Sequence, residues 1–175
     1  FIDENFDEKI VRAYISIAPN YGAARADLFR YLLIYKQGGV YLDIKSGTSR
    51  PLSEVINPDD TVILAKWRNQ AGEEHEGAGM AGPMRRIPGG EFQQWNIIAE
   101  PNHPFLEAAI SQVMENINKY KFWWHGTGRR SVIRLTRPIA YTLSIERIRE
   151  NIPYREVRGA SELGLVYSVL GDESA

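Results

Sequence analysis

The clearest pattern of apolar positions lies between residues 23 and 37. Leu28, Leu32 and Tyr35 recur three and four residues apart, which is the spacing that places side chains on one face of a helix. Gly38 follows at once, and a glycine there can take the positive φ that commonly ends a helix. The pattern therefore predicts a helix over residues 23–37 that ends at a glycine turn.

An alternating pattern follows that turn at residues 40–44. This stretch is rich in β-branched and aromatic side chains, which favours a short strand. Successive strand side chains point to opposite faces, so the apolar positions share one face and the polar positions share the other. The apolar positions are Val40, Leu42 and Ile44; the polar positions are Tyr41, Asp43 and Lys45.

Weaker patterns predict the remaining elements. Helices are expected over residues 3–17, 104–120 and 138–150, and strands over residues 61–66, 154–157 and 165–169. Residues 69–90 are rich in glycine and predict a long irregular loop, whose acids Glu73, Glu74 and Glu76 are expected to be solvated. Alternating helices and strands predict an α/β fold with a partly parallel sheet, and 175 residues fit one domain.

Composition narrows the function classes. The 21 basic and 22 acidic side chains leave a net charge of −1, which argues against nucleic-acid or membrane-surface binding driven by bulk charge. Cysteine is absent, which excludes disulfides, thiolate nucleophiles and cysteine zinc sites, and three histidines argue against a histidine-rich metal centre. No apolar run approaches the ~20 residues that span a bilayer. We therefore expect neither a nucleic-acid partner nor a membrane segment in this chain.

Candidate chemistry is densest around the predicted helix and strand. Asp27 and Arg30 are three residues apart and share a helix face, and Asp43 lies near the carboxyl end of its strand, where α/β sheets bind ligands. With the Tyr41 phenol, these groups would converge on one crevice and suit a polyhydroxy ligand. The alternative is that Asp27 and Arg30 form a surface helix pair and that Asp43 caps the following turn.

The stretch Ala23–Lys45 resembles the sugar-binding region of family 32 glycosyltransferases. Ala26-Asp27 and Arg30-Tyr31 match the helix of that region, Gly38-Gly39 match its turn, and Tyr41-Leu42-Asp43 match the start of its Asp-x-Asp motif. Two weaker landmarks follow. They are the segment Gln94-Trp95-Asn96 with the downstream His103-Pro104, and Thr136-Arg137-Pro138.

The resemblance implies a GT-A fold, a Rossmann-like nucleotide-sugar-binding α/β domain with a mostly parallel sheet. It implies that Asp27 and Arg30 bind the donor sugar, that Tyr41 lies against the donor, and that Asp43 contacts ribose or sugar hydroxyls and anchors a metal through water. The family begins with a strand well upstream of this helix, whereas few residues precede it here. We expect residues 1–175 to form a single domain that lacks that N-terminal strand.

Lys45 stands where the family has the second acid of its motif, which binds a divalent cation, Mn²⁺ or Mg²⁺. An ammonium group cannot be a ligand to such a cation. Three alternatives follow: Lys45 itself neutralises the donor diphosphate; other carboxylates hold the metal with Asp43; or the protein is catalytically inactive. We favour the first two, because the rest of the sugar-binding stretch is intact. Without such a role, Lys45 would point to solvent after the strand.

A basic and aromatic segment offers a second anion-binding candidate. No Asp or Glu occurs between Asn116 and Ile145, and residues 122–130 join aromatics, glycines and arginines. Glycine amides and arginine forks suit a diphosphate, and flat aromatic rings suit sugars. The alternative is a solvated loop that its tryptophans anchor to the core. The candidates for diphosphate or acceptor contacts are Trp124, His125, Arg129 and Arg130.

The resemblance thus implies a glycosyltransferase, in detail a hexosyltransferase, that moves a sugar from a UDP- or GDP-sugar to an acceptor hydroxyl with retention of configuration. The acceptor is expected to be a glycan, a lipid or a protein. The cellular location is left open between the cytoplasm and, for a longer chain, the Golgi lumen. One alternative is a catalytically degenerate protein that binds a nucleotide sugar or a glycan. Another is an α/β domain that acts through protein contacts.

Overall fold

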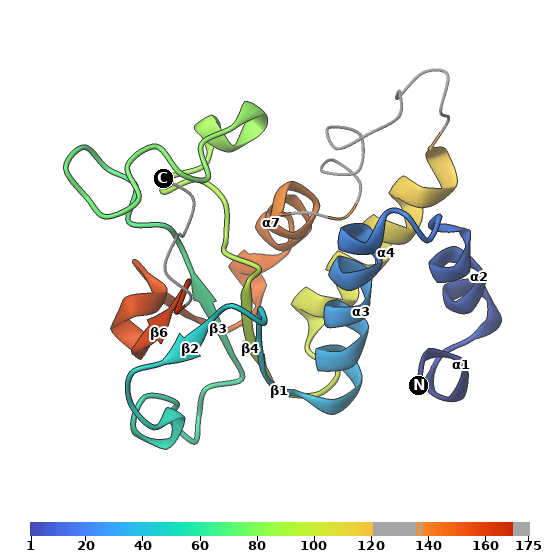
Figure 1. Ribbon diagram of the computed structural model, residues 1–175, viewed down its shortest axis with the longest axis horizontal. Helices are drawn as coiled ribbons and strands as arrows, with labels where there is room; N and C mark the ends of the chain where they lie inside the picture. The colour runs from blue at the N-terminus through green and yellow to red at the C-terminus, as the bar shows by residue number, and fades with distance from the viewer. Residues whose placement is uncertain (121–135, 137, 170–175) are drawn as a thin grey trace. The chain divides into compact units, whose positions relative to one another are not determined.

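The computed structural model describes residues 1–120, 136 and 138–169, which gather into two compact units (Figure 1). The helical unit comprises Phe1–Gly38 and Glu100–Ile152, and the sheet unit comprises Gly39–Ala99 and the residues from Pro153 onward. Each unit buries apolar side chains of its own. None of the helices in the described ranges combines the length and the apolar character needed to cross a bilayer.

The helical unit is built around α4, which packs against α2, α3 and α7. Its core side chains come from three of these helices and include Leu28, Leu32, Phe105, Val113 and Ile145, each fully buried. Leu28 and Leu32 are buried, as the predicted apolar face of the long helix requires, whereas Tyr35 of the same face is only half-buried. The helices of this unit are α1 (Ile2–Asn5), α2 (Glu8–Ser16), α3 (Gly22–Gln37), α4 (Pro104–Lys119) and α7 (Pro138–Glu146), with a 3₁₀ turn at Arg149–Asn151.

Helix ends follow capping chemistry. The predicted helix over residues 3–17 is broken at Phe6, because the Asp7 side chain accepts a hydrogen bond from the Ile10 amide and starts α2 as its N-cap. His103 caps α4 in the same way, and Pro104 occupies its first turn, where the missing N–H costs nothing. At the end of α3, Gly38 takes a φ of 66° and donates its N–H to Ile34, as predicted.

The sheet unit contains a four-stranded sheet in the order β1-β4-β3-β5. Two of its pairings, β1–β4 and β3–β4, are antiparallel, and only β3–β5 is parallel. A partly parallel sheet is thus confirmed, but a mostly parallel one is wrong for the described strands. The reason is that β3 returns to β4 through a loop without an α-helix, whereas parallel neighbours need a long crossover, usually helical. The strands are β1 (Gly39–Leu42), β3 (Val62–Ala65), β4 (Asn96–Ala99) and β5 (Arg155–Val157).

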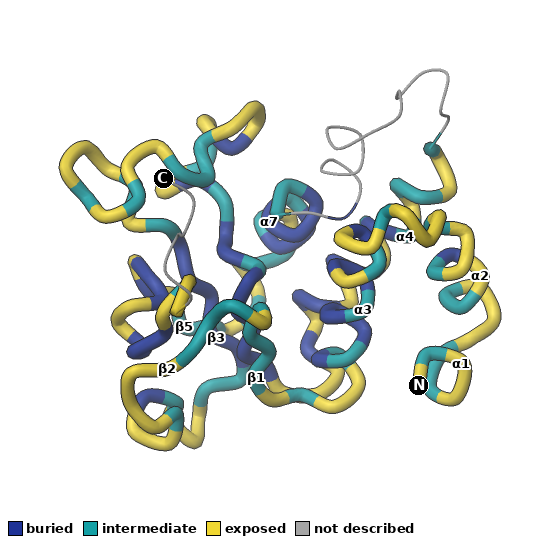
Figure 2. The backbone as a smooth tube through the Cα atoms, viewed as in Figure 1, coloured by how far each residue is buried: buried dark blue, intermediate teal, exposed yellow. Residues whose placement is uncertain are grey.

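Two smaller differences affect the site. The strand β1 ends at Leu42 rather than at residue 44, and Ile44 is fully exposed in a turn that the Ser46 amide closes onto the Asp43 carbonyl. A two-stranded sheet of β2 (Gly47–Thr48) and β6 (Leu165–Val166) then follows the turn. Strands β3 and β4 are buried along their whole length (Figure 2). The remaining 3₁₀ turns are Leu52–Glu54, Gly82–Arg86 and Ala160–Leu163.

Candidate functional site

The predicted pair Asp27 and Arg30 lies on α3 in the interior of the helical unit. Arg30 Nη2 is 3.1 Å from Asp27 Oδ1, and the two side chains are 8% and 4% exposed. The Thr136 hydroxyl donates to the other carboxylate oxygen, Asp27 Oδ2, at 2.8 Å. The alternative of a surface helix pair is therefore wrong: this pair is buried, and its carboxylate is held from two sides.

The aromatic side chains next to this pair fix the position of Thr136. Tyr31 stacks on Tyr141 with ring centroids 5.4 Å apart and nearly parallel planes, and its hydroxyl donates to the Thr136 carbonyl at 3.1 Å. Burial raises the pKa of the Tyr141 phenol well above its ordinary value. The third sequence landmark thus meets the first within the helical unit, through Thr136 and Asp27.

The predicted acid Asp43 lies in the sheet unit, directly after β1. The Tyr41 hydroxyl donates to Asp43 Oδ1 at 2.9 Å, and the Asp43 amide donates to the Trp95 carbonyl at 2.8 Å. Both side chains are half-buried. The structure therefore brings these two predicted residues together, at a place in the sheet unit that retains access to solvent.

Lys45 does not simply extend into solvent. Its ammonium group lies 4.4 Å from the centroid of the Tyr167 ring, in a cation–π contact. The Ser46 hydroxyl donates to the Tyr167 carbonyl, and the Val169 amide donates to the Lys45 carbonyl, both at 2.9 Å. Sequence reasoning missed Tyr167, because no local pattern links residues more than a hundred positions apart.

The residues of this site do not by themselves fit a divalent cation. Mg²⁺ and Mn²⁺ take oxygen ligands, commonly one or two protein carboxylates together with substrate phosphates and water. Within the ranges that the structure describes, no group of three His, Asp or Glu side chains is placed to hold a metal ion. Asp43 remains as a single carboxylate, and Lys45 occupies the place of the second acid with a positive charge.

A row of aromatic rings runs beside Asp43 in the sheet unit. Trp95 lies 5.2 Å from Tyr167, Tyr167 lies 5.6 Å from Trp67, and Trp67 lies 5.0 Å from His75, measured between ring centroids. Trp95 is 4% exposed, and its indole N–H has no hydrogen-bond partner among the described residues. An unmet buried donor costs about 1–3 kcal/mol.

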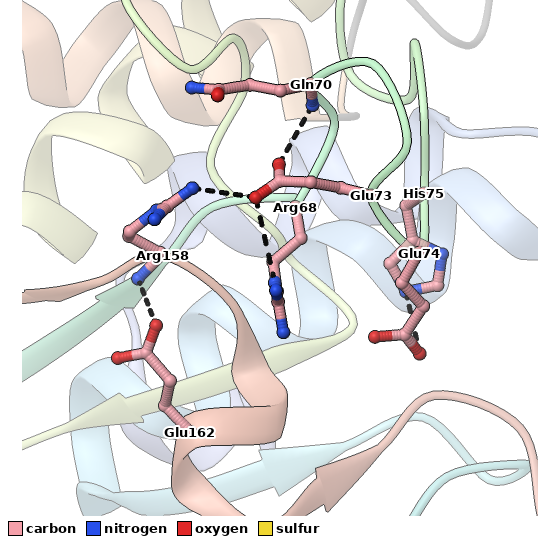
Figure 3. Close-up of polar contacts among 7 residues, drawn as sticks. All are labelled: Arg68, Gln70, Glu73, Glu74, His75, Arg158 and Glu162. Carbon is pink, nitrogen blue, oxygen red and sulfur yellow. Dashed lines mark hydrogen bonds and ion pairs between the residues drawn. The ribbon is translucent and has the colours of Figure 1, made fainter.

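The glycine-rich loop that contributes His75 is irregular, as predicted, but ion pairs hold it in place. Glu73 is paired with Arg158 at 2.7 Å and lies 3.9 Å from Arg68 (Figure 3). Its side chain is only 15% exposed, so the prediction that this acid is solvated is wrong. At the start of the loop, the buried Lys66 donates to the carbonyls of Pro88 and Gly90.

Glu91, at the end of this loop, has a raised pKa. Burial raises the pKa of Glu91, and a hydrogen bond from the Trp67 indole, 3.2 Å away, offsets a part of that rise. Glu91 therefore holds the Trp67 ring of the aromatic row through its indole N–H. Of the other predicted candidates, Trp124, His125, Arg129 and Arg130 lie outside the described residues.

Comparison with known proteins finds matches to glycosyltransferases. Residues 1–63 match the family model described as a glycosyltransferase sugar-binding region containing a DXD motif. The initiation-specific alpha-1,6-mannosyltransferase of Candida albicans is 31% identical over 100 residues, which cover 52% of this chain and 24% of that protein. HOC1 of Saccharomyces cerevisiae is 30% identical over 104 residues, which cover 52% of this chain and 22% of that protein. The match spans about a quarter of the length of these relatives.

A solved structure shows the fold. The PaToxG glycosyltransferase aligns with a TM-score of 0.51 at 19% identity, over 82% of this chain and 42% of that chain. The resemblance to glycosyltransferases with a DXD sugar-binding region is thereby confirmed, as is an α/β fold of the glycosyltransferase kind.

Proposed function

We propose that residues 1–175 form one GT-A glycosyltransferase domain that transfers a hexose from a UDP- or GDP-sugar to an acceptor hydroxyl. Asp27 and Arg30 bind the donor sugar, and Tyr41 and Asp43 bind it or the ribose of its nucleotide. The main support is the half-exposed Asp43, which Tyr41 orients directly after β1.

Lys45 has a specific role in this proposal. Departure of a nucleoside diphosphate develops negative charge, and a fixed positive charge nearby stabilises that transition state. Lys45 supplies such a charge where the resembled motif has a metal-binding acid. Its ammonium group is held by the Tyr167 ring, and a cation–π contact leaves the N–H bonds of the ammonium able to donate to phosphate oxygens.

The reaction needs little beyond binding and charge stabilisation. Contacts of the protein carboxylates with the donor sugar orient its anomeric carbon. Binding then supplies part of the entropy cost of bringing the reacting groups together. Transfer with retention of configuration does not require a protein base when the departing phosphate takes the proton of the attacking hydroxyl. We therefore assign Asp43 and Lys45 to orientation and charge and assign no residue as base.

A second candidate function is nucleotide-sugar or glycan binding without turnover. Lys45 favours it, because the residues described here lack the carboxylates of a metal-dependent site. Measuring transfer and slow hydrolysis over a panel of nucleotide sugars separates the two functions.

Titration calorimetry of UDP- and GDP-sugars, with and without Mn²⁺, tests donor binding. We expect binding by the unmodified chain and its loss in Asp43→Ala. Asp59→Ala is the matched control, since Asp59 is an exposed carboxylate of the same unit. Heats equal to buffer for every donor, with a folded sample, would contradict the donor site.

The role of Lys45 is tested by the nucleoside diphosphates alone. Removing a charged hydrogen bond costs about 1.5–3 kcal/mol, so Lys45→Ala should weaken UDP or GDP binding by tenfold or more at about 1.4 kcal/mol per tenfold. Lys36→Ala removes an exposed lysine of α3 and should change little. Lys45→Asp should restore binding only when Mn²⁺ is present. An unchanged diphosphate affinity in Lys45→Ala would refute charge replacement.

A further inference from the structure

Lys45 is connected to the glycine-rich loop by a chain of side chains within the sheet unit. The Lys45 ammonium lies 4.4 Å from the centroid of the Tyr167 ring. The Tyr167 and Trp67 rings lie 5.6 Å apart between centroids, with their planes at 88°. The Trp67 indole N–H donates to Glu91 Oε1 at 3.2 Å. Two rings therefore link Glu91, at the end of the loop, to the charge of Lys45.

The position of the Lys45 ammonium depends on the orientation of the Tyr167 ring. The negative part of the ring quadrupole lies over the ring faces, so a cation held on a face moves when the ring tilts. The Ser46 hydroxyl fixes the Tyr167 carbonyl, but this bond leaves the side-chain torsions free. Tyr167 is half-buried, and neighbouring side chains must therefore orient its ring.

Two tryptophans contact the Tyr167 ring. Trp95 lies 5.2 Å away between centroids and belongs to the hydrophobic core, where general packing fixes it. Trp67 is half-buried, and its perpendicular contact with Tyr167 is one of the arrangements that aromatic pairs prefer. Trp67 is therefore the contact that can be changed without emptying the core.

The glycine-rich loop holds Trp67 through more than one contact. Besides the bond to Glu91, the His75 ring lies 5.0 Å from the Trp67 ring with the planes at 86°. A Cβ at Gly79 would lie 2.6 Å from Trp67 Cδ1, so the loop backbone packs directly on the indole. The loop thus determines where the Trp67 ring lies.

The loop can act as a support because it is anchored near both of its ends. Glu73 pairs with Arg158, which follows β5, at 2.7 Å (Figure 3). The buried Lys66 donates to the carbonyls of Pro88 and Gly90. These contacts tie the loop to the sheet on which Trp67 and Tyr167 lie.

We propose that Trp67 is a positioning residue for Lys45, which it orients through the Tyr167 ring while Glu91 holds its own indole. The glycine-rich loop then contributes to diphosphate binding through Trp67 rather than by direct contact. The inference deepens the proposed function and rests on it for the diphosphate.

Nuclear magnetic resonance of the ¹³C-labelled full chain tests the position of Lys45 without a nucleotide. The ring current of an aromatic side chain shifts protons above its face upfield, and Lys45→Arg assigns the ε-methylene signal of Lys45. That signal should lie upfield of the signals of exposed lysines such as Lys36. Tyr167→Leu should abolish the upfield shift, and Tyr167→Phe should retain it, because phenylalanine keeps the ring face.

A change at Trp67 measures the proposed role. Trp67→Leu should reduce the upfield shift of the Lys45 signal, and Tyr154→Leu is the matched control. Tyr154 is a half-buried aromatic residue that precedes β5, whereas Trp67 follows the end of β3 that pairs with Val157 at the other end of β5. The control should leave the Lys45 signal in place. Equal changes in both variants would mean general loosening of the unit and would overturn the inference.

Variants of Glu91 test the same link without removing a ring. Glu91→Gln keeps an acceptor for the Trp67 indole N–H and should preserve the Lys45 signal. Glu91→Leu removes the acceptor and should move the signal in the same direction as Trp67→Leu, by a smaller amount. A Lys45 signal that neither Trp67→Leu nor Glu91→Leu changes would overturn the inference, whether or not nucleotides bind.

A double-mutant cycle then connects Trp67 to the diphosphate. Trp67→Leu should weaken UDP or GDP binding about two- to tenfold, the effect of one aromatic contact. In a chain that already carries Lys45→Ala, the same change should alter binding by less than about twofold. Equal weakening with and without Lys45 would show that Trp67 acts by another route and would overturn the inference.

Failure of the proposed function gives a different result. If the Lys45 signal responds to Trp67→Leu as expected but neither UDP nor GDP binds, the two rings position Lys45 and the proposed function is wrong. That result would support the contact chain and overturn its role in diphosphate binding.

Discussion

The two halves of the predicted site differ in how firmly the protein holds them. Asp27 and Arg30 are almost completely buried and are tied to Thr136 inside the helical unit. Asp43 is half-buried in the sheet unit, where it accepts a hydrogen bond from Tyr41. A buried ion pair is coupled to folding, whereas a half-exposed carboxylate can be altered without unfolding the chain. The same sequence block therefore combines a buried, firmly held pair with a half-exposed carboxylate.

The largest effect is expected at the buried half. Asp27→Ala removes the carboxylate that faces a buried guanidinium, and breaking a buried pair costs about 3–5 kcal/mol. Urea denaturation should show this loss as a large drop in the midpoint. Glu8→Ala breaks the exposed pair of Glu8 with Arg12 and should cost at most about 0.5 kcal/mol. Equal losses of unfolding free energy in Asp27→Ala and Glu8→Ala would contradict the expectation that the buried pair contributes more than the exposed pair.

The two glycines of the turn sharpen the comparison, because both take positive φ. A Cβ at Gly38 would lie 2.6 Å from the Pro101 ring, whereas a Cβ at Gly39 would have no neighbour within 4 Å. Gly39→Ala should therefore cost only backbone strain, about 1–2 kcal/mol. Gly38→Ala should add an overlap of about 1–3 kcal/mol.

Denaturation midpoints of the two glycine variants provide the measurement. If Gly39→Ala were as damaging as Gly38→Ala, contact with Pro101 would not be the reason for the glycine. In that case backbone conformation alone would account for both positions.

The sequence predicts those features that depend on interactions between residues close together along the chain. The helix over residues 23–37 and its glycine end were predicted to within one residue, because periodicity and capping are local. Strand β4 was missed, because a short buried run such as Asn96–Ala99 has no alternation that would identify a strand. The direction of β4 relative to its neighbours could not be predicted either, because it depends on the path of the loop between β3 and β4.

The site shows the same limit. Spacing and resemblance single out Asp27, Arg30, Tyr41 and Asp43 as candidates, but they do not predict how deeply each side chain is buried. The position of Lys45 on Tyr167 depends on the pairing of β2 with β6, which no local pattern specifies. Residues brought together by such long-range pairing become visible only in the folded chain.

Two tyrosines allow a finer comparison of the halves. Tyr31→Phe removes a buried hydroxyl that donates to the Thr136 carbonyl and should cost about 1 kcal/mol. Tyr41→Phe removes the half-buried hydroxyl that donates to Asp43 and should cost less, because water can replace it. Thermal unfolding of both variants measures the difference. A larger loss of stability in Tyr41→Phe than in Tyr31→Phe would show that the Asp43 region is held more firmly than the region around Asp27.

The smallest expected effect is a pH dependence in the helical unit. Burial lowers the pKa of His103 below its ordinary value of 6.5, and the Glu100 carboxylate offsets a part of that shift. The neutral ring accepts the Phe105 amide through Nδ1 and caps α4, a role that protonation abolishes. The unfolded chain takes up a proton on this histidine at a higher pH than the folded chain does. Its contribution to the free energy of unfolding is therefore fully present above pH 6.5 and is lost as the pH falls through the lowered folded pKa.

His103→Asn provides the matched control for this pH effect. Asparagine can also cap a helix and does not titrate, so the variant should lack the part of the pH dependence that His103 contributes. Urea midpoints measured between pH 8 and pH 5 should converge as the pH falls, because only the unmodified chain loses this contribution. Parallel curves over the whole range would mean that His103 is not protonated differently in the two states. The contrast between the buried helical unit and the half-exposed Asp43 region would then rest on packing alone.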